Sequence, residues 1–358
     1  MVHTDADMRE HAGVTSDART PGTAARPLRV IVAPDSFKGS ISAHDAAQAI
    51  AAGWRAVRPH DEVVLRPQAD GGEGTLDAIE AATPGSIRRD AGPVTGPDGR
   101  PVPGQWLALP DGTAVIEMAQ MSGLPLMSSL DSVGATSRGL GEVMARALDD
   151  GAERLLIGLG GSASTDAGLP VLAELGERRP PRRGALVLTD VTAPLFGPRG
   201  AAAVFGPQKG ASPTDVEVLD QRLRRAADRL GGDPEEPGAG AAGGVGFALR
   251  VWGADLTSGA AFIAEATGLT ALLASADIVL TGEGRFDAQS LTGKVVGSIL
   301  AAAEAHGVTP GLIVGTAALT PSCWHASLAD IAPSTEAALR EPARWLHAAA
   351  ERAAHELG

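Results

Sequence analysis

The amino-acid sequence predicts an α/β protein with two domains, one of them built from both ends of the chain. The chain has 358 residues, which is long for a single hydrophobic core. Strand-like and helix-like segments alternate from residue 28 onward, and the same alternation returns near residue 270, as in a parallel sheet covered by helices. We therefore expect a discontinuous parallel-sheet domain from residues 28–90 and 270–358, interrupted by a mixed α/β domain at 91–269.

The first part of the chain contains two strand–helix units. LRVIVAP (28–34) is an apolar run rich in β-branched residues and predicts a buried strand. The helix after it should start at Ser42 and Asp45, a pair that resembles a capping box, and end before Arg58, which precedes a proline. EVVLRP (62–67) predicts a second strand, and another helix follows it.

The middle of the chain mixes short strands with helices. Pieces of β character between Pro and Gly turns at residues 94–118 indicate a mixed or antiparallel region. The later segments are a helix at 136–151, a strand entering a glycine loop at 153–168, a strand at 185–190, an amphipathic helix at 214–232 with a Gly stop, and a small-residue loop at 237–246.

Near residue 270 the alternation of strand and helix resumes. ASADIVL (274–280) predicts a strand, and the fourteen residues TGEGRFDAQSLTGK (281–294) predict a loop rich in glycine and charge. A helix then runs to Gly307, and GLIVG (311–315) is the next strand.

The overall composition excludes several classes of protein. A formal net charge of -13 disfavours nucleic acid and anionic membranes as partners, which leaves small molecules. The single cysteine, Cys323, excludes an internal disulfide and a multi-cysteine metal site. No apolar run reaches the length of about 18 residues expected of a membrane helix. Residues 1–27 have no signal-like apolar region and predict a disordered tail, so we expect a cytoplasmic protein.

Four glycine-rich loops each follow a predicted strand: DSFKGS, ADGGEGT, GLGGSASTDAG and TGEGRFDAQSLTGK. Ligands bind beyond the carboxyl ends of parallel strands, where glycine lets backbone N–H groups approach an anion. Lysine adds a charge for phosphate, and carboxylates can hold Mg²⁺, so the loops together carry what phosphoryl transfer needs. Each loop alone has a simpler reading as a turn or a packing glycine, and it is their recurrence that favours a site.

Other catalytic motifs are missing from the sequence. The dinucleotide fingerprint G-x-G-x-x-G does not follow the first strand. The P-loop pattern fails because Lys294 is followed by Val295 rather than by Ser or Thr. GGSAS (160–164) lacks the second glycine of a nucleophile elbow, which disfavours a hydrolase.

Six motifs, in order, resemble those of the bacterial glycerate kinases that phosphorylate the 2-hydroxyl of glycerate. They are IVAPDSFKGS, ADGGEGT, IGLGGSASTDAG, AAAVFGPQKGA, PGAGAAGG and TGEGRFDAQSLTGK. The resemblance extends from about Leu28 to Gly307. It implies a flavodoxin-like domain built from both chain ends, an inserted second domain and an active site in the cleft between them. It also implies ATP and Mg²⁺ as cosubstrates, D-glycerate as acceptor, and 2-phosphoglycerate and ADP as products.

The resemblance also suggests residue roles. Asp190 is the first choice for the base near the glycerate hydroxyl or for Mg²⁺, with Asp287 and Glu283 as competing choices. Lys38 is expected to contact phosphate or the glycerate carboxylate, and Lys38, Asp190 and Asp287 form the expected catalytic set. The expected substrate- and phosphate-binding residues are Asp35, Ser36, Lys38, Gly39, Asp70, Gly71, Gly72, Glu73, Gly74, Gly160, Gly161, Ser162, Asp166, Lys209, Arg285 and Lys294. Of these, Lys209, Arg285 and Lys294 are expected to neutralise phosphoryl charge.

The sequence departs from the family's pattern in several places. Thr165 replaces an asparagine before Asp166, and Thr192 and Ala193 stand where the family tends to carry Asp and Asn. The stretch 176–185 is short, and the tail after GLIVG lacks the family's further strand pattern. Two alternatives therefore stay open, a kinase for another small hydroxy acid and an inactive metabolite-binding relative. The oligomeric state is not indicated by the sequence.

Overall fold

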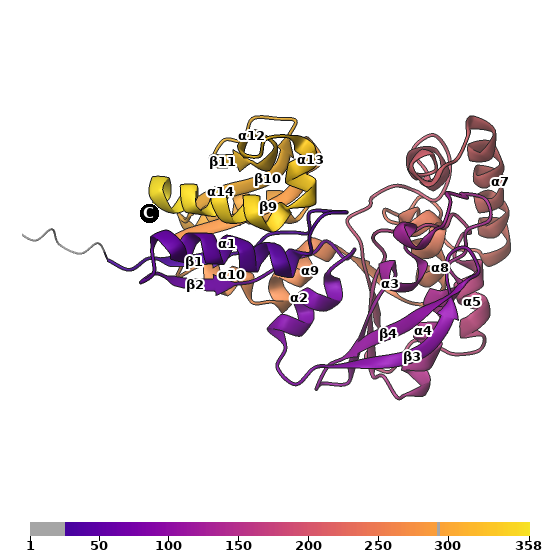
Figure 1. Ribbon diagram of the computed structural model, residues 1–358. Coiled ribbons are helices and arrows are strands. Elements are labelled where there is room, and N and C mark those ends of the chain that lie inside the picture. Colours follow the sequence, from indigo (N-terminus) through magenta and orange to yellow (C-terminus); the bar gives the residue numbers. More distant parts are fainter. Residues whose placement is uncertain (1–25, 292–293) are drawn as a thin grey trace, which may run out of the picture.

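The computed structural model describes residues 26–291 and 294–358 and contains two lobes, each with its own sheet (Figure 1). The predicted disordered tail therefore lies outside the described residues, apart from its last two positions. None of the described helices is both long and apolar enough to cross a membrane.

The first lobe contains a five-stranded sheet in which all neighbouring strands are parallel. Its strand order is β11-β10-β9-β1-β2, which becomes the flavodoxin-like order 2-1-3-4-5 when these strands are counted along the chain. The strands are β1 (Arg29–Val32), β2 (Glu62–Leu65), β9 (Ile278–Phe286), β10 (Thr309–Ala317) and β11 (Trp324–Ser327). Both ends of the chain contribute to this sheet, as the sequence predicts.

Helices cover both faces of the first sheet. Val30 and Val32 pack with α1 and α14, whereas Ile31 and Val279 pack on the opposite face with α10 and α11. Because alternate residues of one strand are buried on opposite sides, β1 is apolar from Val30 to Val32. The indigo helix α1 and the yellow helix α14 lie side by side (Figure 1). The helices of this part are α1 (Ala43–Val57), α9 (Gly259–Ala266), α10 (Leu269–Leu273), α11 (Val295–His306), α12 (Leu328–Ile331), α13 (Thr335–Arg340) and α14 (Pro342–Leu357). Helix α2 (Thr75–Ala82) instead packs Leu76 and Ile79 against the sheet of the second lobe.

The predicted limits of helix α1 are confirmed. The Ser42 hydroxyl accepts a hydrogen bond from the Asp45 backbone N–H, and Arg58 is the C-terminal cap. The next residues fix the start of the sheet, because the buried carboxylate of Asp61 accepts hydrogen bonds from the Leu28 backbone N–H at 3.0 Å and from Trp54 Nε1 at 2.9 Å. Asp61 therefore ties β1 to helix α1.

Replacing Asp61 with asparagine is expected to lower the free energy of unfolding by about 1–3 kcal/mol, because a buried charged acceptor is lost. Burial alone would raise the pKa of Asp61, but hydrogen bonds from Arg58, Leu28 and Trp54 lower it below its ordinary value. A lowered folded-state pKa contributes stability above the unfolded-state pKa, and this contribution disappears as the pH falls. Urea unfolding should therefore show a difference in the free energy of unfolding between the unaltered protein and Asp61→Asn at pH 7, and this difference should narrow toward about pH 3. A difference that stays constant with pH would contradict the role of the charged Asp61 carboxylate as a hydrogen-bond acceptor.

The second lobe contains a six-stranded mixed sheet of order β3-β4-β5-β6-β7-β8. Strands β3, β4 and β5 are antiparallel, and the pairs from β5 to β8 are parallel, which confirms the predicted mixed region. The strands are β3 (Ile87–Thr95), β4 (Pro101–Ala108), β5 (Thr113–Glu117), β6 (Arg154–Gly158), β7 (Ala185–Leu188) and β8 (Asp255–Thr257). Its helices are α3 (Ala119–Ser122), η1 (Leu124–Leu126), α4 (Arg138–Asp149), α5 (Leu169–Leu175), α6 (Ala201–Phe205), η2 (Pro207–Lys209), α7 (Pro213–Leu230), η3 (Ala241–Gly244) and α8 (Val245–Trp252). The domain limits at residues 90 and 270 stay a prediction.

Three elements differ from the sequence-based expectation. Strand β9 continues through Thr281–Phe286, so the first part of the predicted loop 281–294 is strand. A Cβ on Gly282 would lie 1.9 Å from the Ile313 carbonyl oxygen, so this glycine serves close strand contact rather than a turn. The chain after β10 does form a further strand, β11, and the predicted loop 237–246 ends inside helices η3 and α8.

Candidate functional site

The carboxyl ends of β1 and β9 lie side by side at the topological switch point of the first sheet. Strand order reverses between these two neighbours, and such a point is where open α/β sheets bind ligands. A cavity of about 390 Å³ opens there, which we call the switch-point cavity. Its lining residues are Asp35, Ser36, Phe37, Lys38, Ser40, Asp70, Glu283, Gly284, Arg285, Lys294, Gly315, Thr316, Leu328, Thr335, Ala338 and Leu339.

Three carboxylates, those of Asp35, Asp70 and Glu283, line the switch-point cavity. Asp35 is only 9% exposed, and burial together with the charges of Asp70 and Glu283 raises its pKa to about 8. Burial also raises the pKa of Glu283, and its Oε1 atom is buried without a hydrogen-bond partner among residues 26–291 and 294–358. Lys38, Arg285 and Lys294 line the same cavity and balance the three carboxylates in number, so the feature that a cation could use is the buried Oε1 atom of Glu283.

Basic side chains stand beside these carboxylates. Lys38 Nζ lies 4.0 Å from Asp70 Oδ2, and the charges of Asp70 and Asp35 raise the pKa of Lys38. Arg285 and Lys294 line the same cavity. The cavity can thus offer cationic groups to an anionic ligand next to oxygen ligands for a cation.

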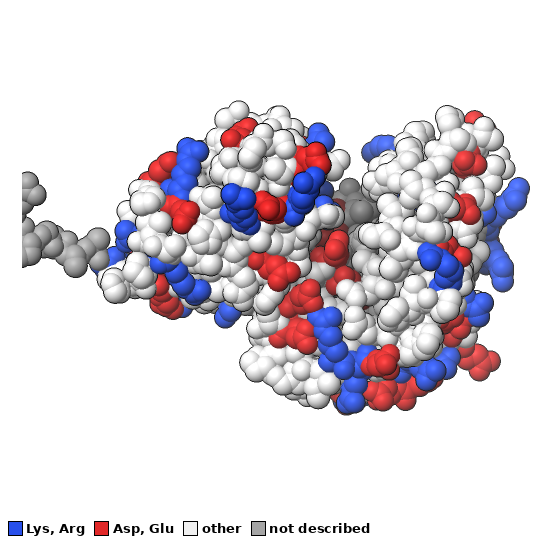
Figure 2. All heavy atoms as spheres, viewed as in Figure 1, with Lys and Arg blue, Asp and Glu red and all other residues white. Residues whose placement is uncertain are grey.

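A second cavity of about 590 Å³, the Lys209 cavity, has walls from both lobes. Its lining residues are Lys38, Gly39, Glu73, Glu117, Ala119, Gln120, Leu124, Pro125, Leu126, Leu159, Gly160, Gly161, Ser162, Val191, Phe205, Gln208, Lys209 and Ala242. Lys38 lines both the switch-point cavity and the Lys209 cavity. The space-filling view shows the surface hollowed between the lobes, with acidic side chains gathered at the lower margin of the hollow (Figure 2).

The loop 70–74 packs closely against the second lobe. A Cβ on Gly71 would lie 2.5 Å from the Leu188 carbonyl oxygen, at the end of β7. A Cβ on Gly160 would lie 2.3 Å from the Cα atom of Gly72. Gly71 and Gly160, which were predicted to bind substrate or phosphate, thus allow close backbone contact between the lobes. A role as packing glycines is the alternative that the sequence left open for these loops.

Glu117 is a cavity residue that sequence reasoning missed. It ends the buried strand β5, and its carboxylate accepts hydrogen bonds from the backbone N–H groups of Leu76 at 3.0 Å and Gly74 at 3.3 Å, at the start of α2. Gln120 donates a third hydrogen bond. Burial raises the pKa of Glu117 to about 7 in spite of these bonds. A glutamate at the end of the otherwise apolar run TAVIE was the available signal.

Asp190 lies at the start of helix α9 rather than free in a cavity. It accepts hydrogen bonds from the Ser258 hydroxyl at 2.7 Å and from the backbone N–H groups of Gly259 at 3.0 Å and Ala260 at 3.2 Å. Burial raises its pKa. In this position both carboxylate oxygens of Asp190 accept hydrogen bonds from the first residues of α9 and from Ser258. The catalytic role of Asp190 stays a prediction.

Two other predicted aspartates also form local contacts. Asp166 is buried and accepts hydrogen bonds from Ser137 and from the Gly168 backbone N–H, so it joins the 160–168 loop to helix α4. Asp287 accepts from the Gln289 backbone N–H and pairs with Arg285 at 3.6 Å. Neither lines the two cavities.

The predicted metal-ligand set, Asp190, Glu283 and Asp287, is not gathered in one place. Across residues 26–291 and 294–358, no group of three or more histidine, cysteine or carboxylate side chains is arranged to hold a metal ion. Mg²⁺ in phosphate sites usually needs only one or two carboxylates, with phosphates and water as its other ligands. Asp35 and Glu283 fit that requirement, because both carboxylates line one cavity and, among the described residues, Oε1 of Glu283 is buried without a hydrogen-bond partner.

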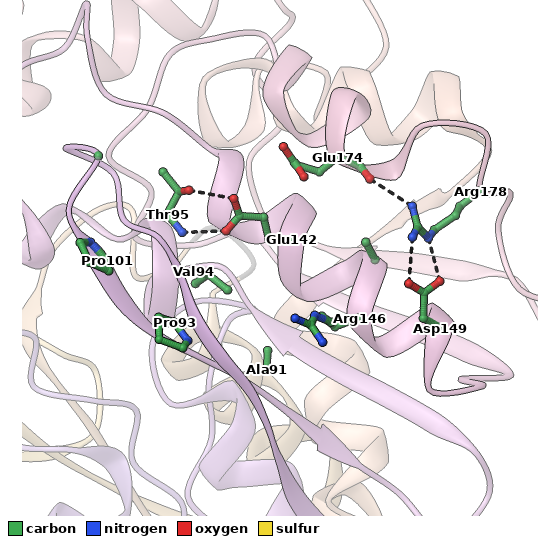
Figure 3. Close-up of a pocket in the computed structure, with 12 residues that line it drawn as sticks. Ala91, Pro93, Val94, Thr95, Pro101, Glu142, Arg146, Asp149, Glu174 and Arg178 are labelled. Carbon is green, nitrogen blue, oxygen red and sulfur yellow. Dashed lines mark hydrogen bonds and ion pairs between the residues drawn. The ribbon is translucent and has the colours of Figure 1, made fainter.

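A third cavity, the α4 groove, has about 540 Å³ and lies between β3, α4 and α5 (Figure 3). Several of its charged groups already have partners. Glu142 accepts from the backbone N–H and hydroxyl of Thr95, and Arg178 forms two hydrogen bonds to Asp149. Asp149 ends α4 just before β6 begins, so this part of the groove lies toward the amino end of that strand, where ligands of open sheets are not expected.

Comparisons with known proteins agree with this geometry. A model of the glycerate kinase family matches residues 30–185 and 177–357. The chain is 42% identical over 319 residues to a glycerate kinase of Bacillus subtilis (strain 168), covering 78% of this chain and 83% of the relative. It is 40% identical over 306 residues to a glycerate 2-kinase of Escherichia coli (strain K12), covering 75% and 80%. A crystal structure described provisionally as glycerate kinase 2 of Salmonella typhimurium LT2 matches with a TM-score of 0.74 and 35% identity, over 92% of this chain and 98% of that one.

Proposed function

Because the chain belongs to the glycerate kinase family, we propose that it transfers the terminal phosphoryl group of ATP to the 2-hydroxyl of D-glycerate. The products are 2-phosphoglycerate and ADP. One observation carries the assignment of the site, namely that Lys38 lines both the switch-point cavity and the Lys209 cavity. A phosphoryl donor in one cavity and its acceptor in the other would meet at this ammonium group.

The nucleotide belongs in the switch-point cavity. Arg285 and Lys294 supply positive charge for its phosphates. Leu328, Ala338 and Leu339 form an apolar wall in the same cavity, which suits the flat face of a base. This assignment follows the rule that open α/β sheets bind ligands beyond the strand ends at the switch point.

The acceptor belongs in the Lys209 cavity, with its hydroxyl toward Lys38. The hydroxyl oxygen forms the new bond to phosphorus as the bond from phosphorus to ADP breaks. Asp70, whose Oδ2 lies 4.0 Å from Lys38 Nζ, is the carboxylate beside this junction that takes the hydroxyl proton. Positioning and charge neutralisation supply most of the rate in such reactions, so the base has a secondary role.

Asp35 and Glu283 are the residues that would hold Mg²⁺. When bound, it would neutralise charge on the phosphate oxygens. Asp35 follows the carboxyl end of β1, and Glu283 lies inside β9. The carboxylate of Asp35 accepts a hydrogen bond from the Ser36 backbone N–H at 2.6 Å, which fixes its direction. A cytoplasmic location, where ATP is available, agrees with this function.

A second candidate is a kinase for another small hydroxy acid. Thr192 and Ala193 directly follow Val191, which lines the Lys209 cavity, and these are the positions where the sequence departs from the family's usual pattern. An assay of ADP release with Mg-ATP and a panel of small hydroxy acids separates the two candidates. The highest kcat/KM is expected for D-glycerate. A higher value for another acid would favour the second candidate, and folded protein without turnover on any acid would contradict both.

A further inference from the structure

Lys209 carries a buried positive charge on the floor of the Lys209 cavity. It ends the short helix η2 and is only 2% exposed. Its Nζ donates hydrogen bonds to Ser162 Oγ at 3.0 Å and to the Ser164 carbonyl oxygen at 2.6 Å. An ammonium group has three N–H donors, so one remains for a ligand in the cavity.

This charge has no close counter-ion. Within the described part of the chain, no carboxylate forms an ion pair with Lys209, and both of its hydrogen-bond partners are neutral. Burial lowers the pKa of Lys209 to about 8, and the charge of Asp166 opposes that shift. Asp166 itself is already bonded to Ser137 and Gly168. An isolated buried ammonium is costly, so an anion that enters the cavity would be stabilised there.

The remaining wall decides which anion fits. Leu124, Leu126 and Phe205 line the cavity, and apolar walls make the desolvation of a multiply charged phosphate expensive. The polar side chains of the lining include the carboxylates of Glu73 and Glu117, which also oppose a multiply charged anion more than a singly charged one. A single buried ammonium matches a singly charged carboxylate. Lys209 is also absent from the lining of the switch-point cavity, where the phosphates of a nucleotide are proposed to lie.

We propose that Lys209 and Ser162 bind the carboxylate of the hydroxy-acid acceptor and so select acids over neutral alcohols. This inference rests on the proposed function and replaces the expectation that Lys209 neutralises the transferred phosphoryl group. The carboxylate at Lys209 then directs the acceptor hydroxyl toward Lys38, the residue shared by the two cavities.

The test is Lys209→Met, which removes the charge and keeps much of the side chain's length. The KM for D-glycerate should rise about 10- to 100-fold, the loss expected for a charged hydrogen bond, while the KM for ATP changes less than about threefold. Lys294→Met in the switch-point cavity is the matched control, and it should show the opposite pattern. A thermal shift with nucleotide that persists in Lys209→Met would show that the fold and the other cavity are intact.

A comparison of substrates on the unaltered protein keeps the proposal testable if Lys209→Met does not fold. Glyceramide has an uncharged amide in place of the carboxylate, and its kcat/KM should be at least about 100-fold below that of glycerate. Equal rates on both compounds would overturn the proposal, as would an unchanged glycerate KM in folded Lys209→Met. No turnover on any hydroxy acid would instead refute the proposed function.

Discussion

Replacing Lys38 with methionine is expected to lower kcat by about 10²- to 10³-fold, the loss typical of one group that stabilises charge in a transition state. Lys38 lines both cavities, and its Nζ lies 4.0 Å from Asp70 Oδ2. The charges of Asp70 and Asp35 raise its pKa, so the ammonium form persists at neutral pH. The KM values for both substrates should change less than the turnover does, because the charge is most needed during transfer.

The folded state should tolerate this change. The Lys38 side chain is 64% exposed, and substitutions at such positions usually alter the free energy of unfolding by less than about 0.5 kcal/mol. Lys38→Arg is the control that keeps the positive charge, and it should recover part of the lost rate. Steady-state kinetics with each substrate varied in turn measures the effect. A kcat for Lys38→Met within about threefold of the unaltered protein would remove Lys38 from the proposed transfer step.

Asp35→Asn is expected to lower turnover about 100-fold and to raise the Mg²⁺ concentration needed for half-maximal rate. The amide keeps the size of the side chain and removes the charge that a hard cation requires. Asp35 lies at the carboxyl end of β1 in the switch-point cavity with Glu283. A Mg²⁺ titration of the activity, with the nucleotide saturating at every point, measures the shift. An unchanged Mg²⁺ dependence would contradict the assignment.

Although Asp35→Asn should lower turnover, it should raise the stability of the ligand-free protein at high pH. Burial, Asp70 and Glu283 raise the pKa of Asp35 to about 8 in the folded chain, well above its ordinary value. Between the ordinary pKa and about 8, the folded state then binds more protons than the unfolded state, so Asp35 lowers stability as the pH rises. In EDTA, Asp35→Asn should be more stable than the unaltered protein near pH 9 and closer to it near pH 5. Lower stability of the variant at high pH would contradict the raised pKa of Asp35.

The sequence predicted the fold well where local pattern and tertiary packing agree. Residues 30–32 are apolar on both faces because α1 and α14 cover one side of β1 and α10 and α11 the other. The cap at Ser42 needs only residues three positions apart. Glycine misled the prediction at 281–286, since Gly282 permits contact with Ile313 inside a strand. Such a contact joins distant parts of the chain and leaves no local signal.

The candidate site was predicted in part for the same reason. Asp35, Lys38 and Glu283 follow or extend strands whose ends meet at one edge of the sheet, so their position could be read from the strand pattern. The burial of Lys209 could not be read from FGPQKG, which resembles an ordinary turn. The three hydrogen bonds that hold Asp190 at helix α9 were also invisible, because Ser258 and its neighbours lie far along the chain.

Phosphorus NMR of the reaction product tests the central claim most directly. The protein, Mg-ATP and D-glycerate are incubated together, and the proton-coupled spectrum of the new phosphate ester is recorded. A phosphate on the 2-hydroxyl has one proton on the attached carbon and gives a doublet, whereas a phosphate on the primary 3-hydroxyl has two and gives a triplet. We predict ADP together with a doublet that coincides with authentic 2-phosphoglycerate. A triplet, or folded protein that forms no phosphate ester of glycerate, would contradict the account.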